Sequence, residues 1–156
     1  MLEIETNRDY QGFQSSGSYG PFSEPSAIPE VSFDEKSQKV LGKAFWKMAE
    51  LYKFTREEQA VLLGIKYNRQ RLLQFEKDKL IPMDPDKFIR VGNLIGIHKN
   101  LKIFYTHHPD IVYEWMRMKH DFFNGKSPLE FIMKDPVNSF SRIFTVRRLL
   151  DQIRAS

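Results

Sequence analysis

The chain has 156 residues, of which 41% are hydrophobic and 13% aromatic. This is enough for a sizeable core and excludes a wholly disordered protein. It contains no cysteine, which excludes disulfides, thiolate catalysis and Cys-based zinc or iron–sulfur sites. The net charge is −6 over residues 1–35 and +10 over residues 36–156. The predicted folded part is therefore basic, as in proteins that bind polyanions and also in helical proteins with lysine-rich solvated faces.

Residues 1–33 are predicted to form a disordered acidic tail. Within 11–30, 11 of 20 positions are Gly, Ser or Pro and no apolar period is present, so burial cannot offset the entropy of ordering the segment. No apolar run reaches the roughly 20 residues of a membrane span, and the start, MLEIETNRD, lacks the basic and apolar regions of a secretory signal. We therefore expect a cytoplasmic protein that does not enter a membrane.

From Phe33 onward the apolar residues recur at helical spacing, which predicts an all-α protein without a sheet. The apolar stripe of the first helix comprises Val40, Leu41, Ala44, Phe45, Met48, Ala49, Leu51 and Tyr52. Thr55 and Glu58 form a capping box that starts a second helix, and Gly64 ends it. A third helix is predicted over about 67–77.

The remaining helices are also placed by caps and breakers. Asp84 and Pro85 start a helix that Gly96 is predicted to end, and a separate helix then runs to about His107. The apolar face of the first of these is Phe88, Ile89, Val91, Leu94 and Ile95. Pro109 opens the next helix, whose inward stripe is Ile111, Val112, Trp115, Met116 and Met118. Ser127, Pro128 and Glu130 cap another, and the last helix runs from about Phe140 to Ile153 with Ile143, Val146, Leu149, Leu150 and Ile153 on one face.

Residues 54–77 have the pattern of a helix-turn-helix. Ala60 is small enough for two helices to cross, and Gly64 permits a left-handed turn. Leu63 and Leu73 are the expected anchors, but Gln70 occupies a position that is usually apolar, so a rotated helix anchored by Tyr67, Leu72 and Phe75 is the alternative. The residues predicted to contact DNA are Lys66, Asn68, Arg69, Gln70, Arg71 and Gln74. Arg suits guanine, Asn and Gln suit adenine, and Lys neutralises phosphate; an ordinary helical hairpin with a solvated basic face is the competing interpretation.

The second half of the chain contains a series of short motifs in a shared order. They are a "GI-K-L" helix, a Trp in the following helix, an "F-G-SPL" segment and a closing "VR-LD-R" helix. The matching positions are Gly96, Ile97, Lys99 and Leu101; Trp115; Phe123, Gly125, Ser127, Pro128 and Leu129; and Val146, Arg147, Leu150, Asp151 and Arg154. In these motifs the chain resembles the Xre/MbcA/ParS antitoxin family over roughly residues 36–156.

This resemblance implies an Xre-like helix-turn-helix domain over 34–96 and a toxin-binding domain over 97–156. The implied function is that of a type II antitoxin, which sheathes a RES-domain toxin that destroys NAD and, as a dimer, represses its own operon. The residues implied in toxin binding are Trp115, Phe123, Leu129, Arg147, Arg148, Leu150, Asp151 and Arg154. Members of the family typically obstruct the toxin's entrance with their C-terminal segment. The arginines of the last helix fit such a basic plug, although basic residues near a helix end also complement its dipole.

Two other functions stay open. One is a stand-alone helix-turn-helix regulator without a toxin, and the other is a partner-binding adaptor that has lost DNA binding, which the polar Gln70 favours. Enzymatic activity is not expected, because no Ser, His and Asp form a recognisable triad and no glycine-rich loop could cradle phosphate. The adjacent His107 and His108 lack further ligands for an ion. No metal or cofactor is therefore predicted.

Overall fold

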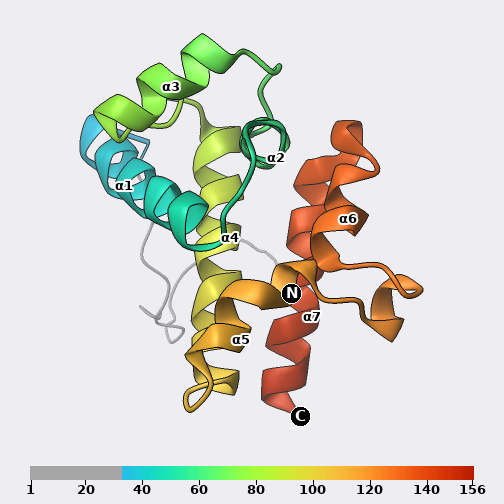
Figure 1. The fold of residues 1–156 in the computed structure, drawn as a ribbon. Coiled ribbons are helices and arrows are strands. Elements are labelled where there is room, and N and C mark those ends of the chain that lie inside the picture. The colour runs from blue at the N-terminus through green and yellow to red at the C-terminus, as the bar shows by residue number, and fades with distance from the viewer. Residues whose placement is uncertain (1–32) are drawn as a thin grey trace, which may run out of the picture. The chain divides into compact units, whose positions relative to one another are not determined.

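The structure, a computed structural model, describes residues 33–156, and all regular elements in that range are helices (Figure 1). The seven α-helices are α1 (Glu35–Leu51), α2 (Arg56–Leu63), α3 (Arg69–Asp78), α4 (Pro85–Phe104), α5 (Pro109–Glu114), α6 (Pro128–Met133) and α7 (Ser139–Ala155). Three short 3-10 helices accompany them: η1 (Trp115–Arg117), η2 (Asp121–Phe123) and η3 (Pro136–Asn138). The all-α prediction is confirmed for this range, while the predicted tail, apart from Phe33, lies outside the described residues.

The helix starts follow the predicted caps. Thr55 and Glu58 form a complete capping box at α2, and Ser127 and Glu130 form a second one at α6. At α4 the Asp84 side chain accepts a hydrogen bond from the Asp86 N–H at 2.9 Å, and Pro85 occupies the first turn. These caps satisfy N–H groups that have no partner within the helix, so local sequence is enough to place these starts.

Helix α4 is the axis of the fold, because α1, α2, α5 and α7 all pack against it (Figure 1). The prediction that Gly96 ends this helix is wrong, since α4 continues for 20 residues to Phe104. Gly96 is instead the point where the Arg147 guanidinium of α7 rests on the α4 backbone, and a Cβ there would collide with it at 2.5 Å from Nε. The glycine therefore allows a close approach rather than a turn.

Helix α7 runs beside α4 in the same direction. Arg147 and Asp151 of α7 bond respectively to Asn93 and Asn100 of α4, so the residue numbers rise together along both helices. The boundary expected after Gly96 falls inside α4, and Phe33–Ser156 cluster as one unit. The residues just before and just after Gly96 therefore belong to the same helix, α4.

Helix α1 is held by the segment that follows α3. The Trp46 indole N–H donates to the Leu80 carbonyl at 2.8 Å, and the Gln38 amide donates to the Ile81 carbonyl at 2.7 Å. Gly42 makes this approach possible, because a Cβ there would lie 2.6 Å from the Leu80 Cα. Two side chains of α1 thus bind a stretch of backbone 34 and 43 residues away in the sequence.

Several side chains predicted to be buried are exposed. They are Val40, Ile89, Met118 and Ile153, with exposed fractions of 40–61%. Met118 differs because α5 stops at Glu114 and the chain becomes extended after η1, so it no longer follows the helical stripe.

Candidate nucleic-acid interface

The α2–α3 pair is joined by a tight turn whose conformation depends on Gly64. Gly64 adopts a left-handed conformation with φ 72°, where other residues are strained, and its N–H closes the end of α2. Ala60 is buried where the pair meets. Asn68 then caps α3 by accepting the Arg71 N–H at 3.0 Å. The α2–α3 connection is therefore a glycine-dependent turn followed by a capped helix.

The anchoring of α3 follows the alternative assignment in part. Leu72 is fully buried and Phe75 is half-buried, whereas Leu73 and Tyr67 are 37% and 46% exposed. With Leu72 directed inward, the position two residues earlier points outward, so Gln70 is exposed and needs no apolar environment. The polar residue at position 70 is therefore compatible with a packed α3.

All six residues predicted to contact DNA are exposed: Lys66, Asn68, Arg69, Gln70, Arg71 and Gln74. Three of them have contacts of their own. Asn68 caps the helix, the Arg71 guanidinium lies 5.4 Å from the centre of the Phe75 ring, and Gln74 donates to Asp78 at 2.8 Å. The side chains of Lys66, Arg69 and Gln70 make no hydrogen bond or ion pair with residues of the described range, so they are free to bind a ligand.

The charge is concentrated at the start of α3. Lys66, Arg69 and Arg71 lie there without an acidic neighbour in the sequence, while Glu76 and Asp78 lie near the far end. The unsatisfied N–H groups and the dipole at a helix N-terminus add to this positive potential. A helix end with this charge attracts anions, of which phosphate is one.

The residues implied in toxin binding divide into a buried and an exposed group. Trp115, Phe123, Leu129 and Leu150 are 2–7% exposed and belong to the core. Trp115 packs on His120, and Phe123 packs on Phe131, with ring centres 4.8 and 5.0 Å apart. A partner at the surface does not reach these side chains in this conformation, so their role in the fold is to shape the segment that carries the others.

Arg148 and Arg154 are exposed on α7, whereas Arg147 and Asp151 lie in the seam between α7 and α4. Arg147 Nε donates to Asp151 Oδ2 at 3.2 Å, and the Asn100 amide donates to Asp151 Oδ1 at 2.8 Å. Arg147 is therefore turned toward α4. Of the three arginines of the predicted basic plug, only Arg148 and Arg154 are exposed. Asn100 was not singled out from the sequence; a polar residue inside the apolar pattern of α4 was the available signal.

A buried arginine joins α2, α4 and α7. Arg90 donates from Nε to Asp86 at 2.9 Å, and from Nη1 to the Ser139 hydroxyl at 2.8 Å and the Val61 carbonyl at 3.3 Å. Burial by itself would raise the pKa of Asp86, but hydrogen bonds from Lys87 and Arg90 lower it below its ordinary value. This junction was also missed from the sequence, where Arg90 is a single charge in an apolar stretch.

A second arginine ties the start of α2 to η1. The Arg117 guanidinium donates to both oxygens of Glu58, at 2.8 and 3.0 Å, and to the Lys53 carbonyl at 2.8 Å. Burial alone would raise the pKa of Glu58, but the bonds from Arg117 and from the Thr55 N–H lower it overall. The carboxylate of Glu58, which caps α2, is thus ionised, and the Arg117 guanidinium balances its charge.

Within residues 33–156 no three His, Cys, Asp or Glu side chains are grouped so that they could hold a metal ion. None of the helices in that range is both long and apolar enough to cross a membrane. His107 and His108 are both exposed.

No model of a known protein family matches the chain. The chain is similar to "Uncharacterized protein y4oB" of Sinorhizobium fredii (strain NBRC 101917 / NGR234), with 29% identity over 112 residues that span 71% of this chain and 81% of that protein. The name of that protein states no activity or partner, so the functional assignment rests on the surfaces described above.

Proposed function

We propose that the protein is a type II antitoxin that neutralises a RES-type, NAD-degrading toxin through its C-terminal half and represses its own operon through α3. The observation that carries the proposal is the contact of Gly96 with Arg147 and of Arg147 with Asp151. These three residues belong to two separate motifs of the resemblance, about 50 positions apart in the sequence. That they meet in one seam supports the idea that both motifs serve a single structure.

In this proposal the two functions use different helices, α3 and α7. Lys66, Arg69 and Arg71 of α3 contact operator DNA, and a homodimer brings two copies of α3 to successive half-sites. Arg148 and Arg154 of α7 enter the toxin's cleft, where a site for the phosphates of NAD favours cations. The exposed positions of these five residues support this division.

The test compares two double variants in cells that express the cognate toxin. Arg148→Ala with Arg154→Ala is expected to allow NAD depletion while operator binding is unchanged. Arg69→Ala with Arg71→Ala is expected to protect NAD but to weaken operator binding by about 1–3 kcal/mol for each arginine that touches a base. Each variant is the control for the other, because both remove two exposed positive charges.

The readouts are the cellular NAD level and the retardation of an operator fragment at fixed salt. Full protection of NAD by the α7 variant would place the toxin contact elsewhere, and equal retardation of the α3 variant and the wild type would refute the DNA surface. A stand-alone regulator is the second candidate, because Lys66, Arg69 and Gln70 are uncommitted. It predicts operator binding together with no affinity for any toxin encoded beside the gene.

A further inference from the structure

A groove of about 650 Å³ runs along α1 beside the residue that ends α3, Lys79. Val40 in this groove is 61% exposed, although it belongs to a helix whose other large apolar side chains are covered. The volume falls in the range of sites that hold a bound ligand. The groove is lined by Val40, Ala44 and Trp46, which are apolar, and by Lys43, Lys47, Glu50 and Lys79, which are charged.

The apolar floor of the groove is fixed by contacts with the chain that follows α3. The Trp46 indole N–H is bonded to the Leu80 carbonyl at 2.8 Å, and the Trp46 ring meets the Phe45 ring edge to face at 4.9 Å. Gly42 lets the backbone of Lys79 and Leu80 lie directly on α1. A surface that is already ordered binds a partner without a further loss of conformational entropy.

The charged residues of the groove leave an excess of positive charge. Lys47 and Glu50 form an ion pair at 3.7 Å, with side chains that are 66% and 74% exposed. Lys43 and Lys79 form no ion pair or side-chain hydrogen bond with a residue of the range 33–156. Asp78, which precedes Lys79, does not line the groove. Three lysines and one glutamate give the lining a net charge of +2, so it attracts anions.

Lys79 lines the groove from a backbone conformation that favours another residue type. Its φ is 57°, in the left-handed region where a helix usually ends with glycine. Glycine would adopt this conformation without strain, so a lysine here lowers stability. Such strained residues are concentrated at binding sites. The backbone conformation of Lys79 is therefore a second observation, independent of charge, that points to a ligand.

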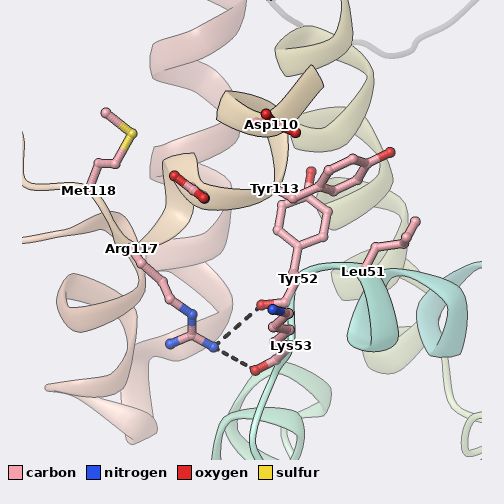
Figure 2. A pocket seen from close by; sticks show the side chains of 8 residues that line it. Leu51, Tyr52, Lys53, Asp110, Tyr113, Arg117 and Met118 are labelled. Atoms are coloured by element: carbon pink, nitrogen blue, oxygen red, sulfur yellow. Dashed lines mark hydrogen bonds between the residues drawn. The ribbon is translucent and has the colours of Figure 1, made fainter. Parts of the chain in front are cut away.

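Another cavity, of about 400 Å³, lies between the end of α1, helix α5 and η1 (Figure 2) and differs from the groove in its charge. Its lining includes two carboxylates, Asp110 and Glu114, and two cations, Lys53 and Arg117. Figure 2 shows the Arg117 guanidinium bonded to the Lys53 carbonyl, at 2.8 Å. Because its charges balance, this second cavity does not select a ligand by sign, whereas the groove on α1 does.

We propose that the groove on α1 binds a short acidic segment of a protein partner. An apolar side chain of the segment packs on Val40, Ala44 and Trp46, and its carboxylates pair with Lys43 and Lys79. Exposed ion pairs are individually weak, so the apolar contact supplies affinity and the lysines supply selectivity. A nucleic acid is disfavoured, because its phosphates would pair with the lysines but leave the apolar floor uncovered.

The length of the segment follows from the geometry of α1. From Val40 to Lys47 the helix rises about 10 Å, which three or four residues of an extended peptide cover. The groove lies at the end of α3 opposite to Lys66 and Arg69, so this binding goes beyond the proposed function and leaves the surface for DNA free.

The test is a titration of the full ¹⁵N-labelled chain with the peptide acetyl-EDLFDE-amide. The peptide is expected to shift the amides of Val40 and Ala44 and the indole N–H of Trp46 in a saturable way. Acetyl-QNLFNQ-amide, which lacks the charges, and acetyl-EDAADE-amide, which lacks the apolar side chains, are each expected to bind roughly tenfold more weakly. Hexathymidylate, a polyanion without such side chains, is expected to leave these three groups unshifted.

A double variant, Lys43→Gln with Lys79→Gly, removes the two unpaired charges and is expected to lower the affinity for acetyl-EDLFDE-amide roughly tenfold. Its melting temperature is expected to stay the same or rise, because glycine suits the backbone at position 79. The matched variant is Lys119→Gln with Lys134→Gln, which removes two exposed charges outside the groove and should keep the wild-type affinity.

Four outcomes would overturn the proposal. They are the absence of saturable shifts at the three groups, equal affinity for the uncharged peptide, equal weakening in the matched variant, and saturable shifts of the same groups by hexathymidylate. The last outcome would assign the groove to polyanions in general rather than to an acidic protein segment.

Discussion

Tyr52 and His98 are hydrogen-bonded to each other, and burial favours the uncharged form of both. Burial raises the pKa of Tyr52, and the neighbouring Tyr113 adds to the effect. Burial also lowers the pKa of His98, and the charge of Lys102 on the same helix lowers it further. Both groups are therefore neutral in the folded chain near neutral pH, which suits a hydrogen bond between a hydroxyl and an unprotonated ring nitrogen.

This pair predicts a loss of stability in mild acid. An imidazole with a lowered pKa in the folded state binds its proton more readily when unfolded, so its contribution is complete above its ordinary pKa of 6.5 and is lost as the pH falls below it. The melting temperature of the wild type is expected to fall between pH 7 and pH 5 by more than that of His98→Gln. Thermal unfolding followed by circular dichroism measures this.

The control for this prediction is His107→Gln, which changes an exposed imidazole. Its melting temperature should fall between pH 7 and pH 5 by as much as that of the wild type. Glu58 and Asp86, whose pKa values are lowered, contribute stability that is lost only at still lower pH. If the melting temperature of His98→Gln fell between pH 7 and pH 5 by as much as that of the wild type, the source of the pH dependence would be another group.

At the level of single elements, glycines in helices have different physical roles. Gly42 allows the Leu80 backbone to lie on α1, Gly96 accommodates the Arg147 guanidinium, and Gly92 has open space where its Cβ would be. A glycine inside a helix weakens it, unless a close contact needs the missing side chain. Only the tertiary structure distinguishes the three.

Alanine substitutions should therefore have opposite effects. Gly92→Ala is expected to raise the free energy of unfolding by about 0.5–1 kcal/mol, because it reduces the entropy of the unfolded chain without a clash. Gly42→Ala is expected to lower it by about 1–3 kcal/mol, because backbone atoms of Lys79 and Leu80 must move. Urea unfolding at constant pH measures both. A stabilising Gly42→Ala would mean that Lys79 and Leu80 are not packed tightly on α1.

The helix starts could be predicted from sequence because caps act over three or four residues. Thr55 with Glu58 and Ser127 with Glu130 do so entirely within their own turns. The end of the helix that contains Gly96 could not be predicted. A glycine that ends a helix and a glycine that contacts a side chain about 50 residues away have the same local sequence pattern. The exposed face of α3 was predictable, but which leucine anchors it depended on the rotation of α3 against the core.

At the scale of the whole molecule, Arg90 connects the α2–α3 pair with the start of α7. Its guanidinium binds Val61 of α2 and Ser139 of α7, and it also lies against Gly64 at the α2–α3 turn. Such a contact is invisible to local pattern, because its parts come from positions up to 49 residues apart. Helical periodicity placed Trp115 and Leu150 on inward faces, whereas the resemblance implied that both bind a toxin, since recurrent apolar residues serve cores and interfaces alike.

Replacement of Arg90 with methionine is expected to cost about 3 kcal/mol of stability, because buried acceptors on α2 and α7 lose their donor. Lys87→Met is the matched control: it removes the other cation bound to Asp86 but leaves α2 and α7 untouched, and it should cost less than half as much. Urea unfolding measures the free energies, and hydrogen exchange at Gly64 and Ser139 should quicken only in the Arg90 variant. Equal losses in the two variants would assign the effect to Asp86 alone.

The shared helix α4 limits how this chain can be dissected by deletion. A fragment that stopped at Asn138 would keep all of α3 yet lose Ile143, Val146 and Leu150, each of which is almost inaccessible to solvent. Such a fragment would uncover the flank of α4, so failure to bind an operator or a partner would report collapse or aggregation of the fragment rather than a missing contact. Each surface of this protein is better assigned with single side-chain changes than with shortened chains.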